Sequence, residues 1–91
     1  MMKTIEITVK GRVQGVFFRQ STRDRAVELG LKGFVRNTAS GDVFITVSGE
    51  ETALADFIAW CHSGPPLARV DHIEVKEKDA TEQFSKFDIT A

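Results

Sequence analysis

The chain has 91 residues, of which 42% are hydrophobic and 27% are charged. These values are ordinary for a globular domain and exclude a disordered chain, and the length accommodates one hydrophobic core, so we expect a single domain over residues 1–91. The 12 basic and 13 acidic residues give a net charge of −1, which argues against a nucleic-acid partner. Any anion-binding site must then be local and built from a few groups.

Cysteine content and hydropathy bear on the compartment. Cys61 is the one cysteine of the sequence, so no intrachain disulfide can form, which suits a reducing environment. Residues 1–10 contain no apolar segment of the kind found in a secretion signal, and no apolar run approaches the length of a membrane span. We therefore expect a cytoplasmic protein without a membrane partner, and a monomer by default.

The first part of the chain predicts a strand, a loop and a helix. Residues 4–13 alternate between apolar and polar side chains, as in a half-buried strand. Gly11 and Gly15 bracket a loop, after which the apolar residues follow helical spacing from Phe18. Gly30 suits the left-handed position that ends many helices. The helix face that we expect to be buried comprises Phe18, Thr22, Ala26 and Leu29.

A β-hairpin is predicted next. A short strand contains Phe34 and reaches about Asn37, and residues 38–42 have the composition of a turn. A third strand alternates from Val43 onward. Gly49 breaks the pattern, so we expect the third strand to end before it.

A second helix and a fourth strand follow. Apolar residues at helical spacing indicate a helix over about 51–62, which the glycine and two prolines of residues 64–66 terminate. A strand over about 70–75 then shows a break in its alternation, which suggests a bulge near Asp71 and His72.

The element order determines the predicted architecture. Residues 79–83 form a polar loop, and a short edge strand ending at Ile89 completes the chain. Two successive strand–helix–strand units, in the order βαββαβ, place both helices on one face of an antiparallel sheet. We therefore expect an α+β sandwich of one sheet and one layer of helices.

The loop between the first strand and the first helix is the best candidate for a functional site. The first N–H groups of a helix lack helical acceptors, and with the helix dipole they favour an anion. Gly11 and Gly15 permit positive φ angles, so successive N–H groups can converge on an anion. Arg19, in the first helical turn, carries a guanidinium fork that matches two phosphate oxygens. The alternative is an ordinary tight turn, but a solvated turn gains nothing from the three apolar residues 16–18.

Two segments resemble the signatures of the acylphosphatase family. The first is Gly11-Arg12-Val13-Gln14-Gly15-Val16-Phe17-Phe18-Arg19. The second is Gly33-Phe34-Val35-Arg36-Asn37, then three residues, Gly41-Asp42-Val43, then five residues and Gly49. With matches at Trp60 and residues 64–70, the resemblance spans about residues 4–89. Phe34 stands where Trp is often found, and residues 87–91 match loosely.

The resemblance implies a ferredoxin-like fold and a metal-independent acylphosphatase without a cofactor, acting on an acyl phosphate and releasing inorganic phosphate. It also implies which residues form the site. Backbone N–H groups of Gly15, Val16, Phe17, Phe18 and Arg19 would hold the phosphoryl oxygens, the Arg19 side chain would bind the phosphate, and the Asn37 amide would hold the attacking water. On local sequence alone, Asn37 reads better as a turn residue.

The remaining candidates read as structural. His62 and His72 lack the cysteine or carboxylate spacing of a metal site, Cys61 lies on the apolar helix face, and Thr22 is expected to pack or to form a hydrogen bond. Two other classes of function stay open. One is a non-catalytic ferredoxin-like domain that binds or senses an anion, and the other is an RNA-recognition module with the same element order.

Overall fold

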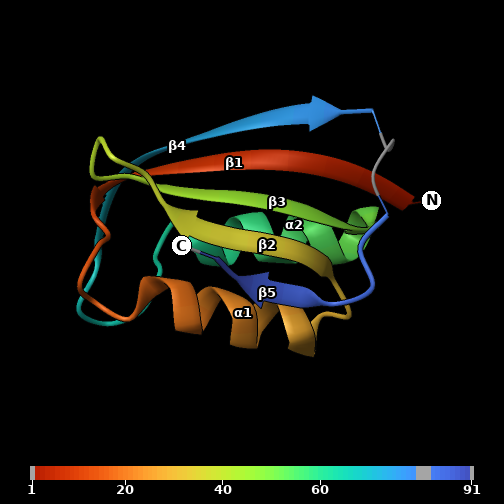
Figure 1. The fold of residues 1–91 in the computed structure, drawn as a ribbon, viewed down its shortest axis with the longest axis horizontal. Helices are drawn as coiled ribbons and strands as arrows, with labels where there is room; N and C mark the ends of the chain where they lie inside the picture. The colour runs from red at the N-terminus through yellow and green to blue at the C-terminus, as the bar shows by residue number, and fades with distance from the viewer. Residues whose placement is uncertain (1, 80–82, 91) are drawn as a thin grey trace.

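The computed structural model describes residues 2–79 and 83–90, so part of the predicted 79–83 loop lies outside the described residues. Two helices cover one face of a five-stranded sheet (Figure 1). The elements are β1 (Met2–Arg12), α1 (Phe18–Glu28), β2 (Lys32–Asn37), β3 (Val43–Glu50), α2 (Glu51–Cys61), β4 (Arg69–Lys78) and β5 (Phe87–Ile89). The predicted α+β architecture, with its βαββαβ order followed by a short last strand, is confirmed.

The strand order in the sheet is β4-β1-β3-β2-β5. The expected antiparallel pairing holds for β1 with β3, β1 with β4 and β2 with β3, whereas β5 pairs with β2 in parallel. The direction of β5 follows from connectivity. β4 ends at the same end of the sheet at which β2 starts (Figure 1), so a strand that begins there and runs along β2 must be parallel to it.

The alternation of β1 builds the core. Ile7 is fully buried and pairs with Ile45 of β3 on one side and Val75 of β4 on the other. The inward side chains of the sheet pack with the buried face of α1 and with Leu54 and Phe57 of α2. Each such buried side chain contributes about 1.5–3 kcal/mol to the stability of the fold. This two-layer core therefore holds the ends of the strands in place.

Gly49 does not end the third strand, and the sequence prediction was wrong at this point. β3 continues to Glu50, with Gly49 paired to Lys3 of β1. A Cβ atom at Gly49 would collide with the Leu31 side chain. The glycine therefore provides space for a core side chain within a regular strand.

The bulge predicted near Asp71 and His72 is present. Lys10 pairs with His72 and Gly11 with Val70, which leaves Asp71 without a partner in the register. Gly11 has a φ of 132°, and a Cβ atom there would strike the Arg69 carbonyl. The bulge increases the local bend of the strand pair just before the chain enters the loop that precedes α1.

The end of α1 is also as predicted. Gly30 has a φ of 71°, and its N–H donates to the Val27 carbonyl at 3.1 Å. The N–H of Leu31 donates to the Ala26 carbonyl at 2.8 Å, which completes a Schellman motif. Leu31 is buried, so the motif also directs the chain back into the core before β2 begins.

Candidate functional site

The loop of residues 13–17 connects β1 to α1 at the left end of the molecule in Figure 1. Gly15 and Phe17 have φ angles of 75° and 63°, whereas Val16 between them is not in the left-handed region. An alternation of backbone hand turns successive N–H groups toward one side and forms an anion-binding nest. Phe17 is the N-cap of α1, and no side chain caps this helix.

The N–H groups of this segment are available to a ligand. Within residues 2–79 and 83–90, the N–H groups of residues 15–20 donate no hydrogen bond to the protein, and Ser21 is the first donor of the helix, to the Phe17 carbonyl at 3.1 Å. Unpaired donors at a helix N-terminus attract an anion because the helix dipole adds to their partial charges. The segment has the geometry for binding a tetrahedral oxyanion.

A cavity of about 360 Å³ opens beside this segment. Arg19 reaches it from the first turn of α1, and Asn37 reaches it from the end of β2. In the described part of the chain, neither side chain forms a hydrogen bond or an ion pair with another residue. The cavity is lined by Val13, Gly15, Phe17, Phe18, Arg19, Gln20, Asn37 and Ile89.

Asn37 is a strand residue rather than a left-handed turn residue. It pairs with Val43 of β3, and its φ angle is not in the left-handed region. The turn that local sequence suggested for it begins one residue later, at Thr38. The sheet brings Asn37 beside a helix end that lies 18 residues earlier in the chain, next to Arg19.

The structure brings most of the predicted site residues together and places the Val16 side chain elsewhere. Gly15, Phe17, Phe18, Arg19 and Asn37 line the cavity, while the Val16 side chain does not and is buried in the core. Phe18 is also buried, but the Phe17 side chain is 70% exposed. Val16 and Phe18 therefore pack into the core, whereas Phe17 lines the cavity while remaining largely exposed.

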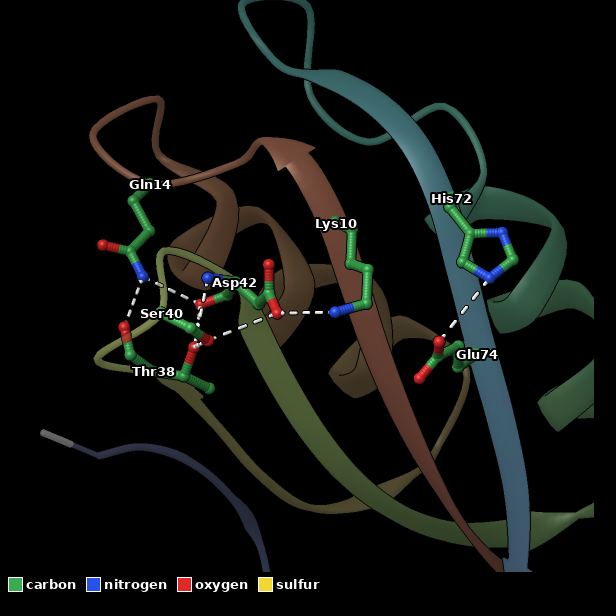
Figure 2. Close-up of polar contacts among 7 residues, drawn as sticks. All are labelled: Lys10, Gln14, Thr38, Ser40, Asp42, His72 and Glu74. Carbon is green, nitrogen blue, oxygen red and sulfur yellow. Dashed lines mark hydrogen bonds and ion pairs between the residues drawn. The ribbon is translucent and has the colours of Figure 1, made fainter.

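Gln14 fixes this loop to the β2–β3 hairpin, a role that sequence reasoning did not assign. Its Nε2 donates to the carbonyl oxygens of Thr38 at 2.9 Å and Asp42 at 2.8 Å (Figure 2). Thr38 directly follows Asn37, so these two bonds set the distance between the anion-binding loop and the amide. The available signal was a polar residue between Val13 and Gly15, inside the loop that the glycines bound.

The hairpin that receives Gln14 is itself braced. The Asp42 N–H donates to Thr38 Oγ1 at 3.1 Å, and the Thr38 N–H donates to the Asp42 carbonyl at 2.9 Å. Lys10 Nζ lies 3.0 Å from Asp42 Oδ2, and this hydrogen bond raises the pKa of Lys10 (Figure 2). The Asp42 carboxylate is thus engaged by Lys10.

The residues set aside in the sequence lie away from this cavity. His62 is the exposed C-cap of α2, and His72 lies on β4, 3.7 Å from Glu74 (Figure 2). Cys61 is fully buried, as expected, and burial raises the pKa of its thiol to about 12. Thr22 is buried too, and its Oγ1 has no hydrogen-bond partner among the described residues.

Residues 2–79 and 83–90 contain no group of three or more histidine, cysteine, aspartate or glutamate side chains placed to hold a metal ion. No helix in the same ranges combines the length and apolar character needed to cross a membrane.

Comparison with known proteins identifies the family of this chain. The family model for acylphosphatase matches residues 5–89. An acylphosphatase of Anaeromyxobacter dehalogenans is 49% identical over 91% of this chain and 89% of its own length, and one of Rubrobacter xylanophilus is 47% identical over 96% and 79%. The crystal structure of the Bacillus subtilis acylphosphatase is 36% identical, covers all of both chains and superposes with a TM-score of 0.94.

Proposed function

Because the chain belongs to the acylphosphatase family, whose members are hydrolases acting on acid anhydrides, we propose that the cavity between Arg19 and Asn37 is its catalytic site. The reaction is the hydrolysis of an acyl phosphate to a carboxylate and inorganic phosphate. The observation that carries the assignment is the set of unpaired N–H groups at residues 15–20, in a segment that lines the same cavity as the unpaired Arg19 guanidinium.

The phosphoryl group is held by charge and by hydrogen bonds. The loop N–H groups donate to its oxygens, and the Arg19 fork binds two of them at once. These donors are fixed by the loop before the substrate arrives, so little reorganisation is needed as charge develops in the transition state. This arrangement binds inorganic phosphate as well, and we expect phosphate to be a competitive inhibitor.

The leaving group explains why so few residues suffice. The bond between phosphorus and the acyl oxygen breaks, and its electron pair remains on a carboxylate whose conjugate acid has a pKa of about 4. Such a group departs without protonation, so the site needs no general acid. Phosphoryl transfer then depends on positioning and on stabilisation of charge. A phosphate monoester with a poor leaving group should be a bad substrate for the same reason.

Asn37 is proposed to orient the water. Its neutral amide can accept a hydrogen bond from the water and hold the water oxygen in line with the breaking bond, but it cannot remove a proton. The new phosphorus–oxygen bond forms to this water, whose protons pass to the phosphate product and to solvent. Gln14 supports the arrangement, because it ties the anion-binding loop to the residue that follows Asn37.

We also propose a monomer in the cytoplasm that does not bind nucleic acid. The single cysteine and the near balance of 12 basic and 13 acidic residues support this. Sedimentation of the purified chain and fractionation of the source cells would test the two parts separately.

The decisive experiment is an assay with benzoyl phosphate, whose loss is followed by absorbance with and without a chelator. The proposed mechanism predicts turnover that a chelator does not change. A non-catalytic anion-binding domain would bind phosphate without turnover, and an RNA-recognition module would retain single-stranded RNA in a salt-dependent way. Either of these results without hydrolysis would contradict the assignment.

A further inference from the structure

We infer that the exposed ring of Phe17 is a subsite for the acyl group, so that the enzyme favours acyl phosphates with an aromatic or extended apolar acyl group over acetyl phosphate. This inference rests on the proposed catalytic site. The inference goes beyond that site, because the anion-binding nest and Arg19 recognise the phosphate alone and leave the acyl group unspecified.

The fold itself gives no reason for a phenylalanine at this position. Phe17 has φ 63° and ψ 25°, a left-handed conformation that is unfavourable for a bulky side chain and that glycine adopts freely. Phe17 is 70% exposed, so little apolar surface is removed from water in return. Strain of this kind at a cavity is a sign of function.

An acyl group that extends from the bound phosphate to the open side of the cavity must pass Phe17. The phosphoryl oxygens face the loop N–H groups, so the acyl oxygen points away from the nest toward the open side of the cavity. Phe17 lines that cavity together with Ile89 of β5. The volume of about 360 Å³ is some ten times the share of one water molecule in the liquid, so a bound phosphate leaves room for a further apolar group.

Other exposed apolar side chains lack this relation to the site. Val27 and Leu67 are 63% and 67% exposed, and neither lines the cavity. Val27 lies on the same helix as Arg19, so Val27→Ala is a matched control. It removes a similarly exposed apolar side chain from α1 without touching the cavity.

The test compares two substrates in one set of variants. For Phe17→Ala we expect kcat/KM for benzoyl phosphate to fall about tenfold, the usual scale for losing apolar contact with a substrate. The value for acetyl phosphate should fall less than that for benzoyl phosphate, so the ratio of the two substrates is the diagnostic quantity, because any change in the loop N–H groups affects both substrates alike. Phe17→Leu should be intermediate, and Val27→Ala should leave the ratio of the two substrates unchanged.

Two results would overturn the subsite. Equal losses for both substrates would show that Phe17 shapes the loop, especially if phosphate inhibition also weakened. Values of kcat/KM in Phe17→Ala that match the parent chain for both substrates would show that the ring does not contact the acyl group. A parent chain that hydrolyses neither substrate would instead contradict the proposed catalytic site, so the two failures are distinguishable.

Discussion

The two strand–helix junctions of this fold share a topology and differ in their electrostatics. Both helices have 11 residues, both follow a strand, and neither has a side-chain hydrogen bond at its N-cap. α2 begins directly after β3 and carries Glu51 in its first turn, 2.9 Å from Lys3. α1 begins after the 13–17 loop, has no acidic residue in its first turn, and carries Arg19 there instead.

The difference shows how a helix end is reserved for a ligand. The partial positive charge at a helix N-terminus is stabilised by a nearby anion. α2 receives that anion from its own sequence, whereas α1 adds a second positive charge and leaves its first N–H groups without acceptors. The α1 end is therefore expected to gain stability from bound phosphate, while the α2 end is already satisfied.

The largest effect is expected from Arg19→Ala. It removes the charged group of the α1 end, so turnover of benzoyl phosphate and binding of inorganic phosphate should both be abolished. Isothermal titration with phosphate and the absorbance assay would measure the two effects. Arg25→Ala is the control, because Arg25 lies on the same helix and pairs with Glu28 at 3.8 Å. Phosphate binding retained in Arg19→Ala would show that the backbone alone forms the site.

Asn37→Ala separates catalysis from binding at the same end. Turnover should fall by roughly 10²–10³-fold, by analogy with the loss of one stabilising donor, while phosphate affinity is spared. Steady-state kinetics with phosphate as a competitive inhibitor would give both values. Full activity in this variant would refute the water-holding role.

Gln14→Ala tests whether the loop is positioned by the hairpin. It removes two hydrogen bonds of 2.9 and 2.8 Å and leaves two carbonyl oxygens without that donor, which should cost about 1–3 kcal/mol of unfolding free energy. Turnover should fall more than phosphate affinity, because Asn37 loses its fixed distance from the nest. Gln14→Glu should be worse than Gln14→Ala, since a carboxylate would face two carbonyl oxygens. Denaturant unfolding and kinetics of both variants would check this order.

Glu51→Gln at the α2 end should have the smallest effect. The hydrogen bond from Lys3 holds the pKa of Glu51 below its ordinary value of 4.5. A carboxyl group whose pKa is lowered by folding stabilises the fold above its unfolded pKa, and this contribution is lost as the pH falls through the folded value. The variant should therefore be slightly less stable near neutrality and equal to the parent chain at acidic pH. Thermal unfolding across pH would show this, with activity unchanged, and a difference that persisted in acid would exclude the charge as its cause.

The family, the element order and the helix ends followed from the sequence alone. Alternating apolar residues in β1 and the glycine that ends α1 are local features, because each depends on side chains or backbone angles within a few positions. The two signatures carried the resemblance that the family model and the relatives confirm. The roles of Arg19 and Asn37 stay predictions, although the structure places both at one cavity.

Only the tertiary structure decided how the site is assembled and which side chains face it. The bonds of Gln14 join residues 24 and 28 positions apart, and no local pattern indicates such a pairing. Of three consecutive apolar residues, Val16 and Phe18 enter the core while Phe17, which has a left-handed backbone, is largely exposed. The continuation of β3 through Gly49 and the parallel direction of β5 likewise depend on residues far along the chain. Local sequence determines the elements, whereas contacts across the sheet determine where their ends meet.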